Sequence, residues 1–152
     1  MQKTHIVTFI NAPREKVWDI MLSDATYRQW TAAFQEGSHF NGTWEEGTKM
    51  LFLGPSPVDG TEGGMVSMVK ANRKHEFVSL ETVAVYGEGK EDSESDMAKV
   101  WIGGTESYTF TDKEGGTELT VDVDIPEDYK EDMEASWKKG LAKLKEIAEA
   151  AA

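Results

Sequence analysis

Residues 10–18, Ile-Asn-Ala-Pro-Arg-Glu-Lys-Val-Trp, mark an abrupt change from an extended pattern to a helical one. The residues just before, Thr4–Ile10, are rich in β-branched and aromatic side chains, which is typical of a strand. Pro13 suits the first position of a helix, and Glu15 adds a favourable charge to its first turn. Apolar side chains then recur at helical spacing, at Val17, Trp18, Met21 and Leu22. The stretch therefore predicts a strand that leads directly into a short amphipathic helix over Pro13–Leu22.

A second short helix is predicted immediately afterwards. Ser23 or Asp24 can cap its N-terminus, and Gly37 ends it. Its apolar and small side chains again follow a helical period, at Tyr27, Trp30, Thr31 and Phe34.

From Ser38 to Pro126 the helical period disappears, and short β-like runs alternate with turn signals such as Gly54–Gly60. The predicted strands are His39–Trp44, Lys49–Leu53, Met65–Ala71, Glu76–Tyr86, Ala98–Thr111 and Thr117–Ile125. Gly103 and Gly104 lie inside one of these runs and suggest a β-bulge that bends the sheet. This spacing favours an antiparallel meander.

The chain then returns to a helical pattern over Glu127–Ala150. One stripe of this segment is apolar, and it consists of Tyr129, Met133, Trp137, Leu141, Leu144, Ile147 and Ala148. The element order predicts an α+β fold with one domain over residues 1–152. In it, a curved antiparallel sheet of about seven strands surrounds a long C-terminal helix, and two short helices follow the first strand.

Charge and cysteine content exclude several function classes. The chain has 16 Lys and Arg against 28 Asp and Glu, a formal charge of −12, which argues against nucleic acid and against anionic membranes as partners. The absence of cysteine excludes disulfides and thiolate chemistry. No apolar run has the roughly 20 residues of a membrane span, and the N-terminus has no signal-peptide pattern. The expected location is the cytoplasm.

The sequence shows no catalytic, metal-binding or cofactor-binding motif. His5, His39 and His75 are scattered, and no serine lies in a Gly-x-Ser-x-Gly pattern. The acidic run Glu91–Asp96 lacks the spacing of a calcium-binding loop and is interpreted as a solvated loop. We therefore predict no catalytic residue, no metal ligand and no cofactor.

The aromatic and methionine content is the most informative functional signal. A sheet that curves around a single helix can leave an apolar cavity, where small ligands commonly bind. Two alternating rows each place a carboxyl group among apolar neighbours, one containing Glu81 and the other Glu106, Tyr108 and Phe110; each carboxyl lies at the sheet margin or inside a pocket. The candidate wall residues are Trp30, Phe52, Met68, Trp101, Tyr108, Met133 and Trp137, with Glu81 as the polar contact.

The Ala-Pro and Val-Trp elements of residues 10–18 resemble the opening signature of the START-like, or SRPBCC, superfamily. The Trp101–Thr109 and Trp137–Leu141 stretches are similar to its bacterial branch related to the activator of heat-shock-protein-90 ATPase. The resemblance implies a helix-grip fold with seven antiparallel strands around the C-terminal helix. It also implies a deep cavity for a hydrophobic or amphipathic small molecule.

Three hypotheses for function remain open. The first is a binding module for a hydrophobic or aromatic small molecule. The second is a cyclase- or hydrolase-like enzyme in which Glu81, aided by Tyr108, acts as general acid or base. The third is a chaperone-regulator-like module, by family analogy, whose acidic windows meet a basic protein partner. An exposed edge strand would allow a homodimer as well as a monomer.

Overall fold

The junction at residues 10–18 connects strand β1 (Gln2–Ile10) to helix α1 (Arg14–Leu22). Pro13, the predicted first residue of the helix, lies instead at the N-cap, and its carbonyl accepts hydrogen bonds from the amides of Lys16 and Val17 at 3.0 and 3.1 Å. The fully buried hydroxyl of Thr117 donates to the carbonyl of Ala12 at 2.7 Å. The Ala-Pro corner is therefore fixed both to its own helix and to a strand far along the chain.

The computed structural model describes residues 1–56 and 59–150. Residues 57–58 of the predicted turn Gly54–Gly60, and residues 151–152 of the predicted domain, lie outside the described residues. After α1, the order of elements is α2 (Asp24–Trp30), the 3-10 helix η1 (Thr31–Ala33), β2 (His39–Asn41), β3 (Lys49–Pro55), β4 (Glu62–Arg73), β5 (Phe77–Gly87), β6 (Lys90–Asp92), α3 (Asp96–Trp101), β7 (Thr105–Lys113), β8 (Gly116–Ile125), the 3-10 helix η2 (Glu127–Tyr129) and α4 (Lys130–Ala150).

The strands form one antiparallel sheet in the order β1-β8-β7-β5-β4-β3-β2. Short β6 pairs with the end of β5 and brings the sheet to eight strands, one more than the predicted seven. The register of β4 against β5 shifts between Val66 and Ser67 and again between Val69 and Ala71. Such bulges increase bending and twist, so they contribute to the curvature of the sheet.

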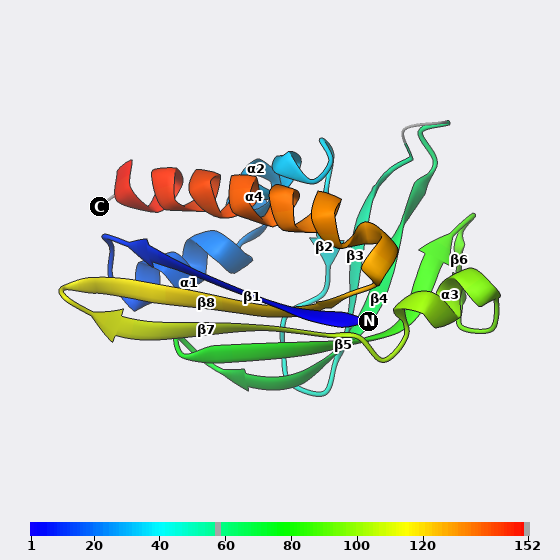
Figure 1. Cartoon of the computed structure of the whole chain (residues 1–152), viewed down its shortest axis with the longest axis horizontal. Coiled ribbons are helices and arrows are strands. Elements are labelled where there is room, and N and C mark those ends of the chain that lie inside the picture. The colour runs from blue at the N-terminus through cyan, green and yellow to red at the C-terminus, as the bar shows by residue number, and fades with distance from the viewer. Residues whose placement is uncertain (57–58, 151–152) are drawn as a thin grey trace.

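Helices α1, α2 and α4 lie on one side of this sheet, α4 runs along it, and α3 lies at the end of the sheet near β6 (Figure 1). The buried face of α4 consists of Trp137, Gly140, Leu141, Leu144 and Ala148. Of the predicted stripe, Met133 and Ile147 are only half-buried and Tyr129 is exposed, whereas Gly140 was not predicted. Helix α1 contacts α4 and strands β7 and β8. Its Trp18 packs on Phe110 of β7, with ring centroids 5.1 Å apart. The α+β architecture predicted from the sequence is thereby confirmed.

The structure corrects the prediction at Ala98–Thr111. Residues 98–101 belong to helix α3, and the strand begins only at Thr105. The hydroxyl of Ser95 caps α3 by accepting a hydrogen bond from the amide of Ala98 at 3.1 Å. Gly103, at φ +90°, lies in the connection between helix and strand and is not part of a bulge. The predicted solvated loop is also partly ordered, because Asp92 accepts hydrogen bonds from the amides of Glu94 and Ser95.

Gly64 allows β3 and β4 to pair closely, which gives a prediction for stability. A Cβ atom at Gly64 would lie 1.8 Å from the carbonyl oxygen of Phe52, so the backbone would have to move. Gly64→Ala is expected to lower the free energy of unfolding, measured in urea, by about 2–3 kcal/mol. Gly87→Ala is the control, because its Cβ would meet nothing within 4 Å. An equal loss in the two variants would contradict this account of the β3–β4 pairing.

Candidate functional site

A cavity of about 320 Å³ lies between the sheet and the helices α2 and α4. Strands β3, β4, β5, β7 and β8 provide one side of it, and α2, η1 and α4 provide the other. The cavity exists partly because the sheet contributes small residues, Gly63, Gly64 and Ser67 of β4, opposite the helices. The side chains that line it are otherwise mainly aromatic or aliphatic, including Tyr27, Trp30, Phe34, Phe52, Leu53, Met65, Leu80, Tyr108, Val123, Met133 and Trp137.

The structure brings six of the eight candidate residues to this cavity. They are Trp30, Phe52, Trp101, Tyr108, Met133 and Trp137. Met68 and Glu81 do not line it, and they face each other as a cross-strand pair of β4 and β5. Leu80 and Thr82 of β5 do line the cavity, so Glu81, which lies between them, projects to the opposite side of the strand.

The helical side of the cavity is a continuous group of aromatic rings. Trp137 of α4 lies with its ring centroid 5.9 Å from Trp30, 5.0 Å from Phe34 and 5.9 Å from Tyr108. Tyr27 extends the group, because it lies 5.4 Å from Trp30 and 6.3 Å from Phe52. Rings from α2, α4, β3 and β7 therefore meet around one space.

Glu106 places a carboxyl group in this aromatic environment. It lies on β7 and lines the cavity together with Tyr108, two residues along the same face. The Tyr108 hydroxyl donates a hydrogen bond to Glu106 Oε2. Burial raises the pKa of the Glu106 carboxyl, and the Tyr108 hydrogen bond offsets this only in part. Burial and the neighbouring Glu106 likewise raise the pKa of Tyr108 well above its ordinary value.

Tyr27 and Glu106 were not among the eight candidates. Burial, and then the proximity of Glu106, raises the pKa of the Tyr27 hydroxyl. Both residues carried a signal in the sequence: Tyr27 shares the helical spacing of Trp30 and Phe34, and Glu106 shares the strand alternation of Tyr108.

One end of the cavity lies between α3 and the start of α4. Trp101 and Met133 line this end, and Tyr129 packs on Trp101 with centroids 5.1 Å apart. Hydrogen bonds of 2.9 Å join the Gly103 amide to the Thr82 carbonyl, and the Thr82 amide to the Gly104 carbonyl. These bonds hold the segment after α3 against β5.

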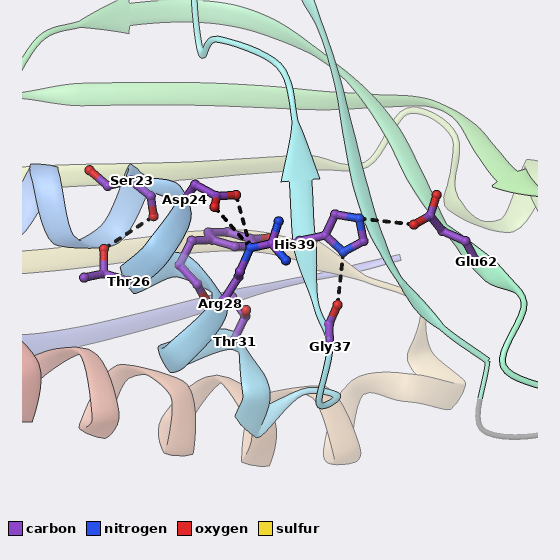
Figure 2. A network of polar contacts seen from close by, with 9 residues as sticks. Ser23, Asp24, Thr26, Arg28, Thr31, Gly37, His39 and Glu62 are labelled. Atoms are coloured by element: carbon purple, nitrogen blue, oxygen red, sulfur yellow. Dashed lines mark hydrogen bonds and ion pairs between the residues drawn. The ribbon is translucent and has the colours of Figure 1, made fainter.

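A polar network fixes the chain between η1 and β2 on another side of the cavity (Figure 2). His39 lies between Gly37 and Glu62: its Nδ1 is 3.0 Å from the Gly37 carbonyl oxygen, and its Nε2 is 3.2 Å from Glu62 Oε2. The Ser38 hydroxyl donates to the Gln35 carbonyl at 2.6 Å, and both residues line the cavity. The network therefore ties this part of the lining to the start of β4.

The described residues contain neither a metal-ligand cluster nor a helix suited to span a membrane. No group of three or more His, Cys, Asp or Glu side chains in residues 1–56 and 59–150 is arranged to hold a metal ion. None of the helices in these ranges is both long and apolar enough to cross a membrane.

Comparison with known proteins identifies relatives by family and by fold. Residues 11–149 match the family model described as Activator of Hsp90 ATPase homolog 1-like protein. No curated protein sequence matches the chain.

Several solved structures share the fold at low sequence identity. A protein from Chromobacterium violaceum has a TM-score of 0.71 and 18% identity, with 97% of this chain and 96% of that chain covered. An AHSA1-like protein from Aeromonas hydrophila has a TM-score of 0.71 and 17% identity, with 99% and 94% covered. The Aha1 dimer from Colwellia psychrerythraea has a TM-score of 0.69 and 16% identity, with 98% and 97% covered. The family match over nearly the whole chain confirms the resemblance inferred from the sequence, and the chain belongs to the Activator of Hsp90 ATPase homolog 1-like family within the START-like superfamily.

Proposed function

We propose that this protein binds a hydrophobic or amphipathic small molecule in the cavity between the sheet and α4. The observation that carries the proposal is the convergence of Trp30, Tyr108 and Trp137, with Phe52 and Met133, around one space that the side chains of the described residues leave open. Binding sites for small molecules are typically concave, largely apolar and provided with a few polar groups. Their usual volume is about 300–1,000 Å³, so a cavity of about 320 Å³ suits a compact ligand.

The position of Glu106 supports a binding function over a purely structural one. A carboxyl group that faces an apolar cavity destabilises the folded state once it ionises, because it loses its hydration. Packing alone would favour an apolar residue at this place. Perturbed carboxyl groups of this kind are found preferentially at functional sites. Glu81, on which the enzyme hypothesis depended, lies outside the lining, so ligand binding is the function that the geometry supports best.

The proposal includes the remaining expectations from the sequence. They are one domain over residues 1–152, a cytoplasmic location, a monomer or homodimer, and a small molecule as partner, with neither nucleic acid nor membrane involved. A chaperone partner is suggested by the family description alone.

Glu106→Gln is expected to stabilise the protein near neutral pH. Burial raises the pKa of the folded carboxyl above its ordinary value of 4.5. The folded state therefore holds this proton at pH values where the unfolded chain has released it, and stability falls as pH rises through the folded pKa. Glutamine keeps the shape of the side chain and accepts the Tyr108 hydrogen bond without ionising. Urea unfolding at a series of pH values should show a higher free energy of unfolding for the variant, with the gap closing toward about pH 4.5.

The control for this prediction is Glu81→Gln, which removes a carboxyl group outside the cavity lining. A gap between wild type and Glu106→Gln that does not change with pH would show that the Glu106 carboxyl is not perturbed by burial.

Ser67→Leu tests the binding function by filling the cavity. Ser67 is buried and lines the cavity from β4, so a leucine there would occupy part of the space. Wild-type protein is expected to bind the neutral fluorophore N-phenyl-1-naphthylamine with an increase in its emission. The variant should bind it about tenfold or more weakly, because space and apolar contacts are lost together.

Ser107→Leu is the matched control. Ser107 lies between Glu106 and Tyr108 on β7, so its side chain projects to the other side of the sheet. Equal fluorophore binding by wild type and Ser67→Leu, in folded protein, would place the binding outside this cavity and contradict the proposal.

A further inference from the structure

The lining of the cavity has carboxyl groups but no basic side chain. Among the described residues that line it, none is Lys, Arg or His, whereas Glu106 and Asp124 are both acids. An anionic ligand such as a fatty acid would therefore find no positive charge in the cavity. This asymmetry bears on which amphipathic molecules the site accepts.

The two carboxyl groups differ in what surrounds them. Asp124 accepts hydrogen bonds from the amide and the hydroxyl of Thr105, both at 2.9 Å, and its Oδ1 lies 3.1 Å from Lys3 Nζ. Its charge is therefore already compensated. Glu106 has no cationic neighbour among the ion pairs of the described residues, and its hydrogen-bond partner is Tyr108.

The second oxygen of Glu106 remains open to a ligand. Oε2 accepts from the Tyr108 hydroxyl, and Oε1 receives no hydrogen bond from the described residues. Glu106 is half-buried and lines the cavity, so part of its side chain borders accessible space. A donor that enters the cavity can therefore hydrogen-bond to Oε1 while the Tyr108 bond stays in place.

The rings around Glu106 suit a positive charge as well. Tyr108 lies 5.9 Å from Trp137, which in turn lies 5.9 Å from Trp30, and the faces of such rings attract cations. Burying a carboxylate opposite Glu106, by contrast, would bring two like charges into a poorly hydrated space.

The end of the cavity near Trp101 is surrounded by acidic chain. Tyr129, which packs on Trp101, lies in the segment Glu127–Glu134, which has five acids and one lysine. That lysine, Lys130, is hydrogen-bonded to Gln2 at 3.0 Å. The segment Tyr86–Asp96, which leads into α3, has five acids and one lysine, and α3 itself adds Lys99. The resulting negative potential attracts cations toward this end.

We propose that the cavity selects hydrophobic molecules that carry a protonated amine, with the ammonium group bound to Glu106 and the apolar part among the aromatic rings. The inference rests on the proposed binding function and adds the class of ligand to it. An ammonium group supplies the positive charge that the lining lacks, and its contact with Glu106 is a charge-assisted hydrogen bond.

The test compares three ligands with the same alkyl chain, namely dodecylamine, dodecanol and dodecanoate, as competitors of N-phenyl-1-naphthylamine near neutral pH. Wild-type protein should bind dodecylamine most tightly and dodecanoate least, with about tenfold or more between them. Glu106→Gln should reduce the advantage of dodecylamine over dodecanol by about tenfold and leave the affinity for dodecanol nearly unchanged.

Glu81→Gln is the matched control, because it removes the same charge from the protein without touching the cavity lining. Glu81→Gln should keep the wild-type order of affinities for the three ligands. If amines were attracted only non-specifically to the acidic surface, the preference for dodecylamine would fall equally in both variants. The inference would be overturned if dodecylamine bound no more tightly than dodecanoate, or if both variants lost the preference for dodecylamine equally. In either case, binding of dodecanol would still support the proposed function. Failure of all three ligands to displace the fluorophore would instead count against the proposed function itself.

Discussion

The contact between Trp30 and Trp137 determines how the two helical parts of the fold sit against the sheet. Trp30 is almost fully buried, and its Nε1 donates to the Met21 carbonyl at 3.1 Å, which fixes the indole relative to α1. A Cβ atom at Gly140 would lie 3.1 Å from Phe34 Cε2 and 3.3 Å from Trp30 Cε3. The absence of a side chain at Gly140 therefore lets α4 approach α2 and η1 closely. With these helices packed on one another, the aromatic rings form one side of the cavity and do not collapse onto the sheet.

The opposite side of the cavity depends on curvature and on small residues. The two register shifts between β4 and β5 bend the sheet. Gly63, Gly64 and Ser67 have small or no side chains, so they leave space between the sheet and α4. The space that results is bordered by rings on one side and by the strand of Glu106 and Tyr108 on the other. A tightly packed interior would be more stable, because empty space costs dispersion contacts and Glu106 costs hydration. The fold thus keeps two unfavourable features at the same place, which is the reason to assign function there.

The sequence predicted the architecture well because its strongest signals are local. The switch from strand to helix at residues 10–18 and the apolar stripe of α4 depend on periodicity alone, and the structure has both. It failed at α3, because the apolar run Val100–Ile102 resembles a strand and the feature that decides for a helix is the Ser95 cap. The sequence also led to Glu81, and not Glu106, being predicted as the polar residue that contacts a ligand. Both faces of β5 are apolar, with Val78 and Leu80 on one and Phe77 and Val83 on the other, so polarity could not show which face points inward.

The central claim is that a ligand occupies the interior between sheet and helix, and methionine methyl groups report on this directly. Met65 and Met133 line the cavity, whereas Met97 of α3 is 71% exposed on the surface. Nuclear Overhauser effects between bound dodecanol and methyl-labelled methionines should appear at Met65 and Met133 and be absent at Met97. Effects at Met97 alone, with none at the two cavity methionines, would place the ligand on the surface and contradict the account.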